Sequence, residues 1–525
     1  MERMVESRVA ASDSTIRFIS RRSLIIGTLW GAFASTSLGK AFGAVAPTFG
    51  QILGAPTSNS ISLSVMANQK LNAYIDLGTS KTVFPLKTSV ADIAPGIPTV
   101  FKATNLKAST TYYYRIRFKT SASSTYQFSK TFSFVTQRSS NSSFAFTVQG
   151  DTHPERKGKM FNEALYTVTL ANILSQKPDF HIMLGDDFSI DPLIGKGQAN
   201  EVNVNNIYLT HRKWLEATMS SVPLYLVNGN HEQAAAYLLD GTKTNPAVLA
   251  GKARNTFFPL PAPDNFYSGD SKIVDGVGLL RDYYAWEWGD ALFVTLDPYW
   301  HSSNPVDNVA GDTTVDDQAS ANPAGGNKQG TKKNQANPSN TPAPSGGNGK
   351  TSNLWSIGIG DEQYSWFKST LEKSKAKYKF VFAHHVMGTG RGAIEVSTNY
   401  EWGGKDPKGQ TTFAKERPNW ELPIHDLMVK NGVSIFFQGH DHIFVTQERD
   451  GLIYQSMPNP ADDTFSMFNE NAYLSGVKAP NSGHVRVSVT PTAAKVEYFL
   501  AARPQDTNRS NLQIAHSYTV LPRTK

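Results

Sequence analysis

The chain has 525 residues, which is long enough for more than one domain with a large core. It contains no cysteine, so disulfides, zinc–thiolate sites and a cysteine nucleophile are excluded, and any metal must be bound by His, Asn and carboxylate side chains. The net charge of +7 is too dilute over this length to indicate nucleic-acid binding, and no nucleic-acid partner is expected.

The N-terminus has the features of an export signal. The pair Arg21 and Arg22 precedes an apolar stretch that runs to about Leu38, and small residues follow as far as Ala44. This order is typical of a twin-arginine signal peptide over residues 1–44, with an uncleaved amphipathic anchor as the alternative. Because no other run approaches ~20 apolar residues, we expect a periplasmic or extracellular protein without a membrane span once the signal is removed.

Residues 45–137 are expected to form a β-sandwich. Apolar and polar residues alternate over 61–65 and 73–77, as they do in half-buried strands. Leu106, a short polar turn and then Tyr112 at the start of an alternating strand match the tyrosine corner of β-sandwiches. The segment resembles a fibronectin type III domain.

The pattern changes to α/β over residues 144–525. A buried strand is predicted at 144–150, a helix at 160–175 and a second strand at 180–184. Further strands are predicted at 225–227, 291–296, 380–383 and 434–437, a helix from Asp361, and strands at 485–489 and 495–500. Residues 302–351 are rich in Gly, Asn, Pro and Ser, which predicts a flexible surface insertion.

Metal-type ligands follow five of the predicted strands. Within an extended segment, residues two apart point to the same side, so the pairs in Asp-x-His and His-x-His can each converge on one centre. Four of these groups directly follow a glycine, and tight turns at three of these glycines are expected to let the chain change direction at the strand end. The candidate ligands are Asp151, His153, Asp186, Asn230, His384, His440 and His442.

The ordered motifs Asp-x-His, Gly-Asp, Gly-Asn-His-Glu, His and Gly-His-x-His resemble those of calcineurin-like dinuclear metallophosphoesterases. With a fibronectin-like domain in front, the nearest relatives resemble purple acid phosphatases. The resemblance covers residues 144–454 and implies a four-layer α/β/β/α sandwich. It also implies that Asp151, His153 and His442 bind one metal, that Asn230, His384 and His440 bind a second, and that Asp186 bridges them.

The resemblance further implies the chemistry. The nucleophile would be a metal-bound hydroxide, and His231, next to Asn230, would stabilise or protonate the leaving oxygen. Purple acid phosphatases place a ferric-iron-binding tyrosine three residues after the bridging aspartate, where this chain has Ser189. The metals are therefore left open among iron, zinc and manganese.

Other polar residues near the motifs have less specific predictions. His385 and Arg391 are candidate substrate contacts, although His385 could equally support a ligand or pack in the core. Asp187 is expected to orient a ligand or cap a helix. A structural role is expected for His181, and no metal-binding role is expected for His425.

The sequence thus predicts a phosphate monoesterase that acts on a small-molecule ester. A phosphodiesterase or nucleotide hydrolase using the same metals is the first alternative, because monoesterases and diesterases share this core. A surface binding protein that kept the fold without turnover is the second. The physiological substrate and the oligomeric state are not indicated by the motifs.

Overall fold

The computed structural model describes residues 47–121, 123–304, 306, 354–386, 391–406 and 408–523. The predicted signal peptide and nearly all of the predicted insertion at 302–351 lie outside these residues. Among the helices that are described, none has both the length and the apolar character needed to cross a membrane.

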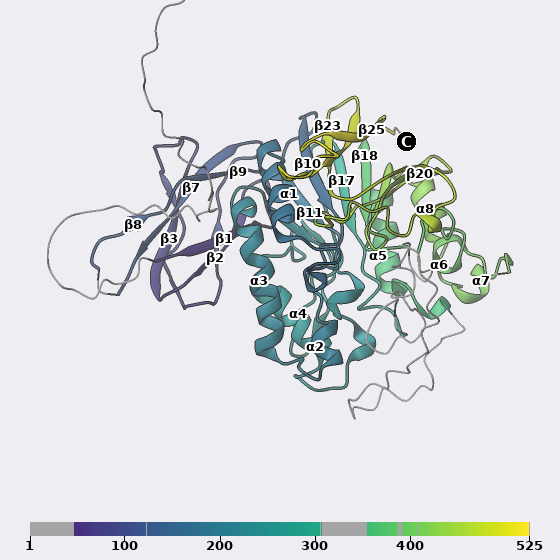
Figure 1. Cartoon of the computed structure of the whole chain (residues 1–525), viewed down its shortest axis with the longest axis horizontal. Helices are drawn as coiled ribbons and strands as arrows, with labels where there is room; N and C mark the ends of the chain where they lie inside the picture. Colours follow the sequence, from purple (N-terminus) through teal and green to yellow (C-terminus); the bar gives the residue numbers. More distant parts are fainter. Residues whose placement is uncertain are drawn as a thin grey trace, which may run out of the picture. The chain divides into compact units, whose positions relative to one another are not determined.

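Two large sheets form the centre of the α/β part (Figure 1). In order, the first contains β25 (Ile514–Val520), β24 (Ala494–Leu500), β23 (Gly483–Val489), β10 (Phe144–Gln149), β11 (Phe180–Met183), β12 (Leu224–Leu226), β1 (Phe49–Gly54), β2 (Ile61–Ala67) and β6 (Thr99–Ala103). The second contains β13 (Ser268–Gly269), β16 (Tyr284–Trp288), β17 (Ala291–Thr295), β18 (Tyr378–Phe382), β19 (Ile435–Gln438), β21 (Leu452–Ser456), β20 (Phe444–Arg449) and β22 (Val477–Ala479). β10, β11 and β12 are parallel, and so are β17, β18, β19 and β21.

Aromatic side chains fill the space between these sheets. Phe146 of the first sheet lies 5.0 Å from Phe293 of the second, measured between ring centroids, and Phe180 lies 5.1 Å from Phe293. Every residue of β10 is buried, as expected for a strand covered on both faces. This shared apolar core fixes the two sheets against each other.

Helices cover the outer face of each sheet. The first sheet packs against α1 (Glu163–Gln176), α3 (Glu201–Met219) and α4 (Pro246–Phe257). The second packs against α5 (Gly360–Lys373) and α8 (Ile424–Lys430). Figure 1 shows α3 and α5 on opposite sides of the sheets. This confirms the predicted α/β/β/α layers.

Short elements complete this part of the chain. They are α2 (Asp191–Gly195), α6 (Tyr400–Gly403), α7 (Phe413–Glu416), η1 (Pro154–Arg156), η2 (Asn230–Glu232), η3 (Ala236–Leu238), η4 (Leu354–Ser356), η5 (Glu470–Ala472), β14 (Ile273–Val274) and β15 (Gly278–Leu279). Helix α1 begins three residues later than predicted, because the Asn162 side chain caps it by accepting a hydrogen bond from Leu165 N at 3.1 Å.

Strands β1 to β9 make up an all-β region ahead of the α/β part. β1, β2 and β6 face a second sheet of β4 (Leu86–Lys87), β3 (Leu71–Gly78), β7 (Thr111–Lys119) and β8 (Gln127–Phe128), with β5 (Ala91–Ile93) and β9 (Phe132–Val135) paired to β3 and β7. The two sheets share an apolar core. Tyr112 Oη accepts a hydrogen bond from Lys107 N at 2.9 Å, which is the contact of a tyrosine corner. The all-β character is confirmed, and the fibronectin type III likeness stays a prediction.

The all-β region is bonded directly to the α/β part. β1 pairs in parallel with β12. The Arg212 guanidinium on α3 donates to the Ser64 carbonyl at 2.7 Å, and Tyr114 Oη donates to the Ser220 carbonyl at 2.6 Å. Residues from Pro47 onward accordingly form one compact unit, and the domain boundary near residue 137 stays a prediction.

Candidate metal centre

The candidate ligands all follow parallel strands of the two central sheets. β10 leads to Asp151 and His153, β11 to Asp186 and β12 to Asn230, while β18 leads to His384 and β19 to His440 and His442. Parallel neighbours end at a common edge, so the two sheets present these side chains together. Each of the seven residues is at most 2% exposed.

The donor atoms form two groups that share one carboxylate. Asp151, His153, Asp186 and His442 place one donor atom each within 4.8 Å of one another, and Asp186, His384 and His440 do the same. Asp186 therefore occupies the position of a bridging ligand between two candidate cation sites. The aspartates and histidines of the two groups are those that the sequence motifs grouped together, and their binding of metal, with Asn230 in the second group, stays a prediction.

Hydrogen bonds on the far side of two imidazoles orient their rings. His153 Nδ1 lies 2.7 Å from Glu155 Oε1, and His384 Nδ1 lies 2.7 Å from the Leu184 carbonyl oxygen. Each Nδ1 can therefore donate its proton to that oxygen, which directs Nε2 of the ring into the site. His384 Nε2 lies 3.0 Å from Asp186 Oδ2. This is the arrangement that a metal-binding histidine requires.

Asn230 reaches the second group through its amide. Its Oδ1 lies 3.1 Å from His440 Nδ1, and its buried Nδ2 has no hydrogen-bond partner within the described chain. In the first group, His153 Nε2 and His442 Nε2 lie 3.0 Å apart. Two imidazole nitrogens at this distance beside carboxylates suit ligands to one cation.

Backbone strain coincides with the candidate ligands. Four of them are non-glycine residues in the left-handed region, with φ of 46° at His153, 58° at Asp186, 67° at His440 and 53° at His442. Such a conformation costs of order 1–3 kcal/mol at each residue and persists where the surroundings enforce it. The chain thus turns at the ligands themselves, which aims their side chains back across the edge of the sheets.

The glycines before the ligands act in two ways. Gly185 has φ of 96° and provides a turn, as predicted. Gly229 has extended backbone, and a Cβ there would lie 2.3 Å from Asp186 Oδ1. A Cβ on Gly439 would lie 2.8 Å from Asp151 Oδ2. These two positions therefore require glycine for close approach to a ligand, whereas the sequence analysis expected a turn.

Glu232 holds two of the ligand loops together. Its Oε1 accepts hydrogen bonds from the backbone N–H groups of Asp187 at 2.7 Å and Phe188 at 3.0 Å. Its Oε2 accepts from Asp186 N at 3.0 Å and from Gly229 N at 2.6 Å. One buried carboxylate therefore fixes the backbone on both sides of the bridging aspartate. From the sequence alone, Glu232 is expected to cap a helix or orient a neighbour, and the structure adds its contacts with the loop that carries Asp186.

Burial and mutual interaction shift the pKa values in the site. Burial opposes ionisation of Asp186, but His384, His231 and His153 together outweigh it and hold its pKa well below the ordinary value. Burial raises the pKa of Asp151 to about 7. Burial also lowers the pKa of His153 well below its usual range, which favours the neutral imidazole that a metal needs.

Three further residues stand beside the candidate ligands on one side of the site. His231 Nε2 lies 3.9 Å from Asp186 Oδ2 and 3.2 Å from Arg156 Nη2. On the opposite edge of its ring, Nδ1 forms a short hydrogen bond with the Asp191 carboxylate. Asp191 and Arg156 were missed by the sequence analysis because they follow the motifs at positions with no fixed spacing.

The two residues predicted as substrate contacts have protein partners. His385 Nδ1 lies 3.2 Å from Tyr299 Oη. Arg391 donates to the His440 carbonyl at 2.6 Å and to Asp441 Oδ1 at 3.2 Å, so it supports the turn between the last two ligands. Their contact with substrate stays a prediction.

Residues expected to have structural roles are bonded within the core. His181 lies between Thr147 Oγ1 at 2.8 Å and Gln149 Oε1 at 3.1 Å. Asp187 accepts a hydrogen bond from Thr152 Oγ1 at 2.7 Å, between the first two ligand loops. His425 on α8 lies 2.8 Å from Tyr454 Oη and 2.9 Å from Asp450 Oδ2. None of the three belongs to the two donor groups.

The donor set fits two hard or borderline cations. Carboxylates, neutral imidazoles and an amide suit iron, zinc or manganese, and a carboxylate can span two cations. The side chains also satisfy the supporting contacts that metal ligands need, with Glu155 and the Leu184 carbonyl behind the imidazoles.

Comparison with known families identifies the class of protein. A family model described as calcineurin-like phosphoesterase matches residues 144–444, more than half of the chain. The chain therefore belongs to the calcineurin-like phosphoesterase family, as the motifs indicated. Family and donor groups together define a metal-dependent phosphoesterase. A comparison with curated protein sequences finds no match.

Two solved structures share the fold over most of the chain. A structure of PhoD is 15% identical and has a TM-score of 0.59, with 90% of each chain covered. The purple acid phosphatase PPD1 from yellow lupin (Lupinus luteus) seeds is 14% identical and has a TM-score of 0.55, with 91% of this chain and 74% of that chain covered. At this identity the likeness establishes the fold alone.

Proposed function

We propose that this protein is an exported phosphate monoesterase with a dinuclear metal site. The observation that carries the proposal is the pair of donor groups joined by Asp186 at the common edge of the two sheets. Iron, zinc or manganese are the metals that suit these ligands. Bound there, they would activate water and neutralise phosphate charge.

The chain's own residues then position the substrate and move a proton. His231 stands next to Asn230 with Nε2 directed toward Asp186, where it can protonate the leaving oxygen. Asp191 holds the other nitrogen of His231 and fixes the ring. Arg156 lies beside His231 Nε2, where its guanidinium can contact a phosphate oxygen.

Hydrolysis of two model esters tests the reaction. The full chain should cleave p-nitrophenyl phosphate, lose this activity to a chelator, and regain it when iron, zinc or manganese is added back. Preferential cleavage of bis(p-nitrophenyl) phosphate would replace monoesterase by diesterase. Binding of both esters without cleavage by the metal-loaded chain would support the non-catalytic binding protein instead.

Single substitutions test the roles of the residues. Asp186→Asn should lose metal and activity together, because it weakens the shared ligand. His231→Ala should keep the metal and lower the rate by ~10²–10⁴-fold. His425→Ala is the control, since it removes a buried histidine outside the donor groups and should leave the metal content unchanged. Loss of metal in His231→Ala would mean that His231 is a ligand.

Export is the second part of the proposal, and it rests on the N-terminal sequence. Arg21 and Arg22 stand before the apolar stretch, in the order of a twin-arginine signal. Replacing both by lysine should retain the full-length chain in the cytoplasm, while the native chain should be exported and begin near residue 45. Equal export of both forms would overturn this part.

A further inference from the structure

A second cluster of metal-type side chains lies outside the donor groups around Asp186. Asp270 follows β13, Asp282 precedes β16, and His301 follows β17. One donor atom from each lies within 4.8 Å of the other two. None of these residues was singled out by the sequence motifs, because they come from three segments separated along the chain.

The two carboxylates are buried and incompletely bonded. Asp270 is 1% exposed and Asp282 is 0% exposed. His301 Nε2 lies 2.7 Å from Asp282 Oδ2, and Lys272 N donates to Asp270 Oδ1 at 2.7 Å. The remaining oxygens, Asp270 Oδ2 and Asp282 Oδ1, are buried, and in the described chain they have no partner other than the opposite carboxyl group. Buried oxygens of this kind are rare unless something binds them.

Ionising both buried carboxylates of the cluster is unfavourable unless a positive charge neutralises them. Two buried carboxylates repel each other, and the His301 imidazole and the Arg254 guanidinium do not outweigh the effect of burial on them. Burial raises the pKa of Asp270 to about 7 and that of Asp282 to about 6, so each carboxylate is costly to ionise here. A divalent cation would neutralise both carboxylates, and a proton shared between them is the other way to reduce the repulsion.

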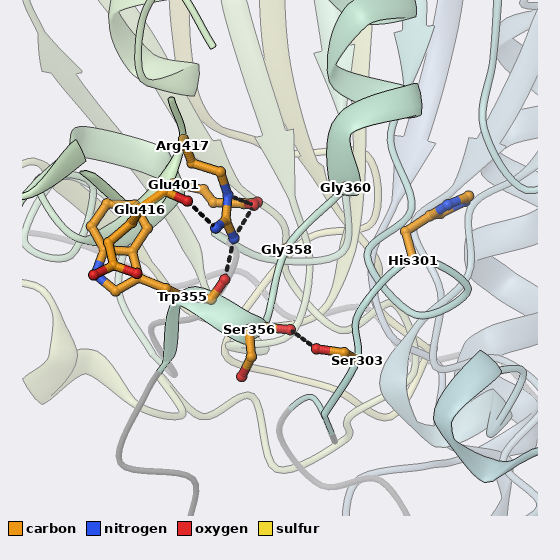
Figure 2. Close-up of a pocket in the computed structure, with 9 residues that line it drawn as sticks. All are labelled: His301, Ser303, Trp355, Ser356, Gly358, Gly360, Glu401, Glu416 and Arg417. Atoms are coloured by element: carbon orange, nitrogen blue, oxygen red, sulfur yellow. Dashed lines mark hydrogen bonds and ion pairs between the residues drawn. The ribbon is translucent and has the colours of Figure 1, made fainter. Parts of the chain in front are cut away.

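We propose that Asp270, Asp282 and His301 bind one divalent transition-metal ion. Two carboxylate oxygens and one imidazole nitrogen suit Zn²⁺ or Mn²⁺, with water completing the coordination. Figure 2 shows the His301 ring directed away from the other residues that line a neighbouring pocket. The ring forms its hydrogen bond with the Asp282 carboxylate instead. The Tyr283 ring covers the histidine at 5.2 Å between centroids.

The ion would fix a loop that borders the candidate metal centre. Asp297, at the start of this loop, accepts hydrogen bonds from the backbone N–H groups of Tyr299 at 2.6 Å and Trp300 at 3.2 Å. Asn228, two residues before Asn230, donates to the same aspartate. Tyr299 Oη in turn contacts His385. The site is therefore structural, and it joins β13 and β16 to the loop that carries Tyr299.

The proposal is tested by measuring how many Zn²⁺ ions the full chain binds. The chain is stripped with a chelator, reloaded with Zn²⁺, freed of excess ion and analysed by elemental mass spectrometry. Asp282→Asn should bind one Zn²⁺ fewer than the native chain, and His301→Gln provides a second variant if the first does not fold. Asp450→Asn is the control. Asp450 also pairs with a histidine, His425, at 2.9 Å, but neither residue belongs to a donor group.

The result is separable from the proposed phosphoesterase site. The loss of one equivalent should also appear in an Asp186→Asn background, where the bridging ligand is already weakened. In that background, Zn²⁺ should still raise the midpoint of thermal unfolding, and Asp282→Asn should abolish the increase. Equal Zn²⁺ content with and without Asp282→Asn, together with no Zn²⁺-dependent stabilisation, would mean a shared proton only and would overturn the proposal.

Discussion

Replacing Glu232 by glutamine would test whether one carboxylate fixes the geometry of the candidate metal centre. Four backbone N–H groups point at its two oxygens, from Asp186, Asp187, Phe188 and Gly229. Glutamine keeps the shape of the side chain but substitutes an NH₂ group for one oxygen. Two of the four N–H groups would then face a donor instead of an acceptor.

The magnitude follows from those two lost hydrogen bonds. A buried donor without an acceptor costs ~1–3 kcal/mol, so E232Q should lower the free energy of unfolding by roughly 2–6 kcal/mol. Small folded domains are stable by ~5–15 kcal/mol, so this loss is large. Because Asp186 lies in the loosened segment with φ of 58°, metal affinity should also fall, by ~10–100-fold.

Two measurements on the same preparation check this prediction. Chemical denaturation gives the free energy of unfolding of the metal-free chain, and competition with a chelating dye gives the metal affinity. Glu401→Gln is the control, because Glu401 is also 1% exposed but lies outside the donor groups. Its metal affinity should equal that of the native chain. An E232Q chain with unfolding free energy within ~0.5 kcal/mol of native and unchanged metal affinity would refute the reasoning.

Three further substitutions test other parts of the structure. Asp191→Asn should lower kcat without releasing metal, because it removes only the partner of His231 Nδ1; metal loss on elemental analysis would contradict this. Tyr112→Phe should destabilise the chain by ~1–2 kcal/mol and leave activity intact, because it removes the acceptor for Lys107 N; an unchanged denaturation midpoint would contradict it. Burial raises the pKa of Glu401 from 4.5 to about 7, so between these pH values the folded chain keeps a proton that the unfolded chain releases. Stability should therefore fall as pH rises through this window, by roughly 3 kcal/mol more in the native chain than in Glu401→Gln, and parallel pH profiles of the two would contradict this.

The sequence was sufficient to predict the parts of the site that depend on a strand pattern or on a short motif. The strand before Asp151 and the strand before Asp186 are short, mainly apolar runs whose residues are all buried, and each leads into a group of polar residues. The ordered motifs thus indicated the candidate ligands. His440 and His442, however, belong to different donor groups and have left-handed backbone, so they do not converge on one centre as predicted for an extended segment. Such signals are local, so they can be read without the fold.

The supporting residues could not be predicted in the same way. Asp191 reaches His231 from 40 residues away, and Tyr299 reaches His385 from 86 residues away. Neither contact has a spacing that a local pattern could specify, because both depend on how the loops fold over the edge of the sheets. Helix α3 was also missed, since its three asparagines and other polar residues obscure the apolar face that packs on the first sheet.

Backbone strain and side-chain support have one physical origin at this site. His153, Asp186, His440 and His442 take left-handed backbone that a free chain would avoid. Glu232 supplies the hydrogen bonds that hold the segment around Asp186 in this state, and they are strong because its carboxylate is buried. Contacts within the protein thus support the ligand loops, and such support would leave less of a cation's binding energy to be spent on ordering the chain.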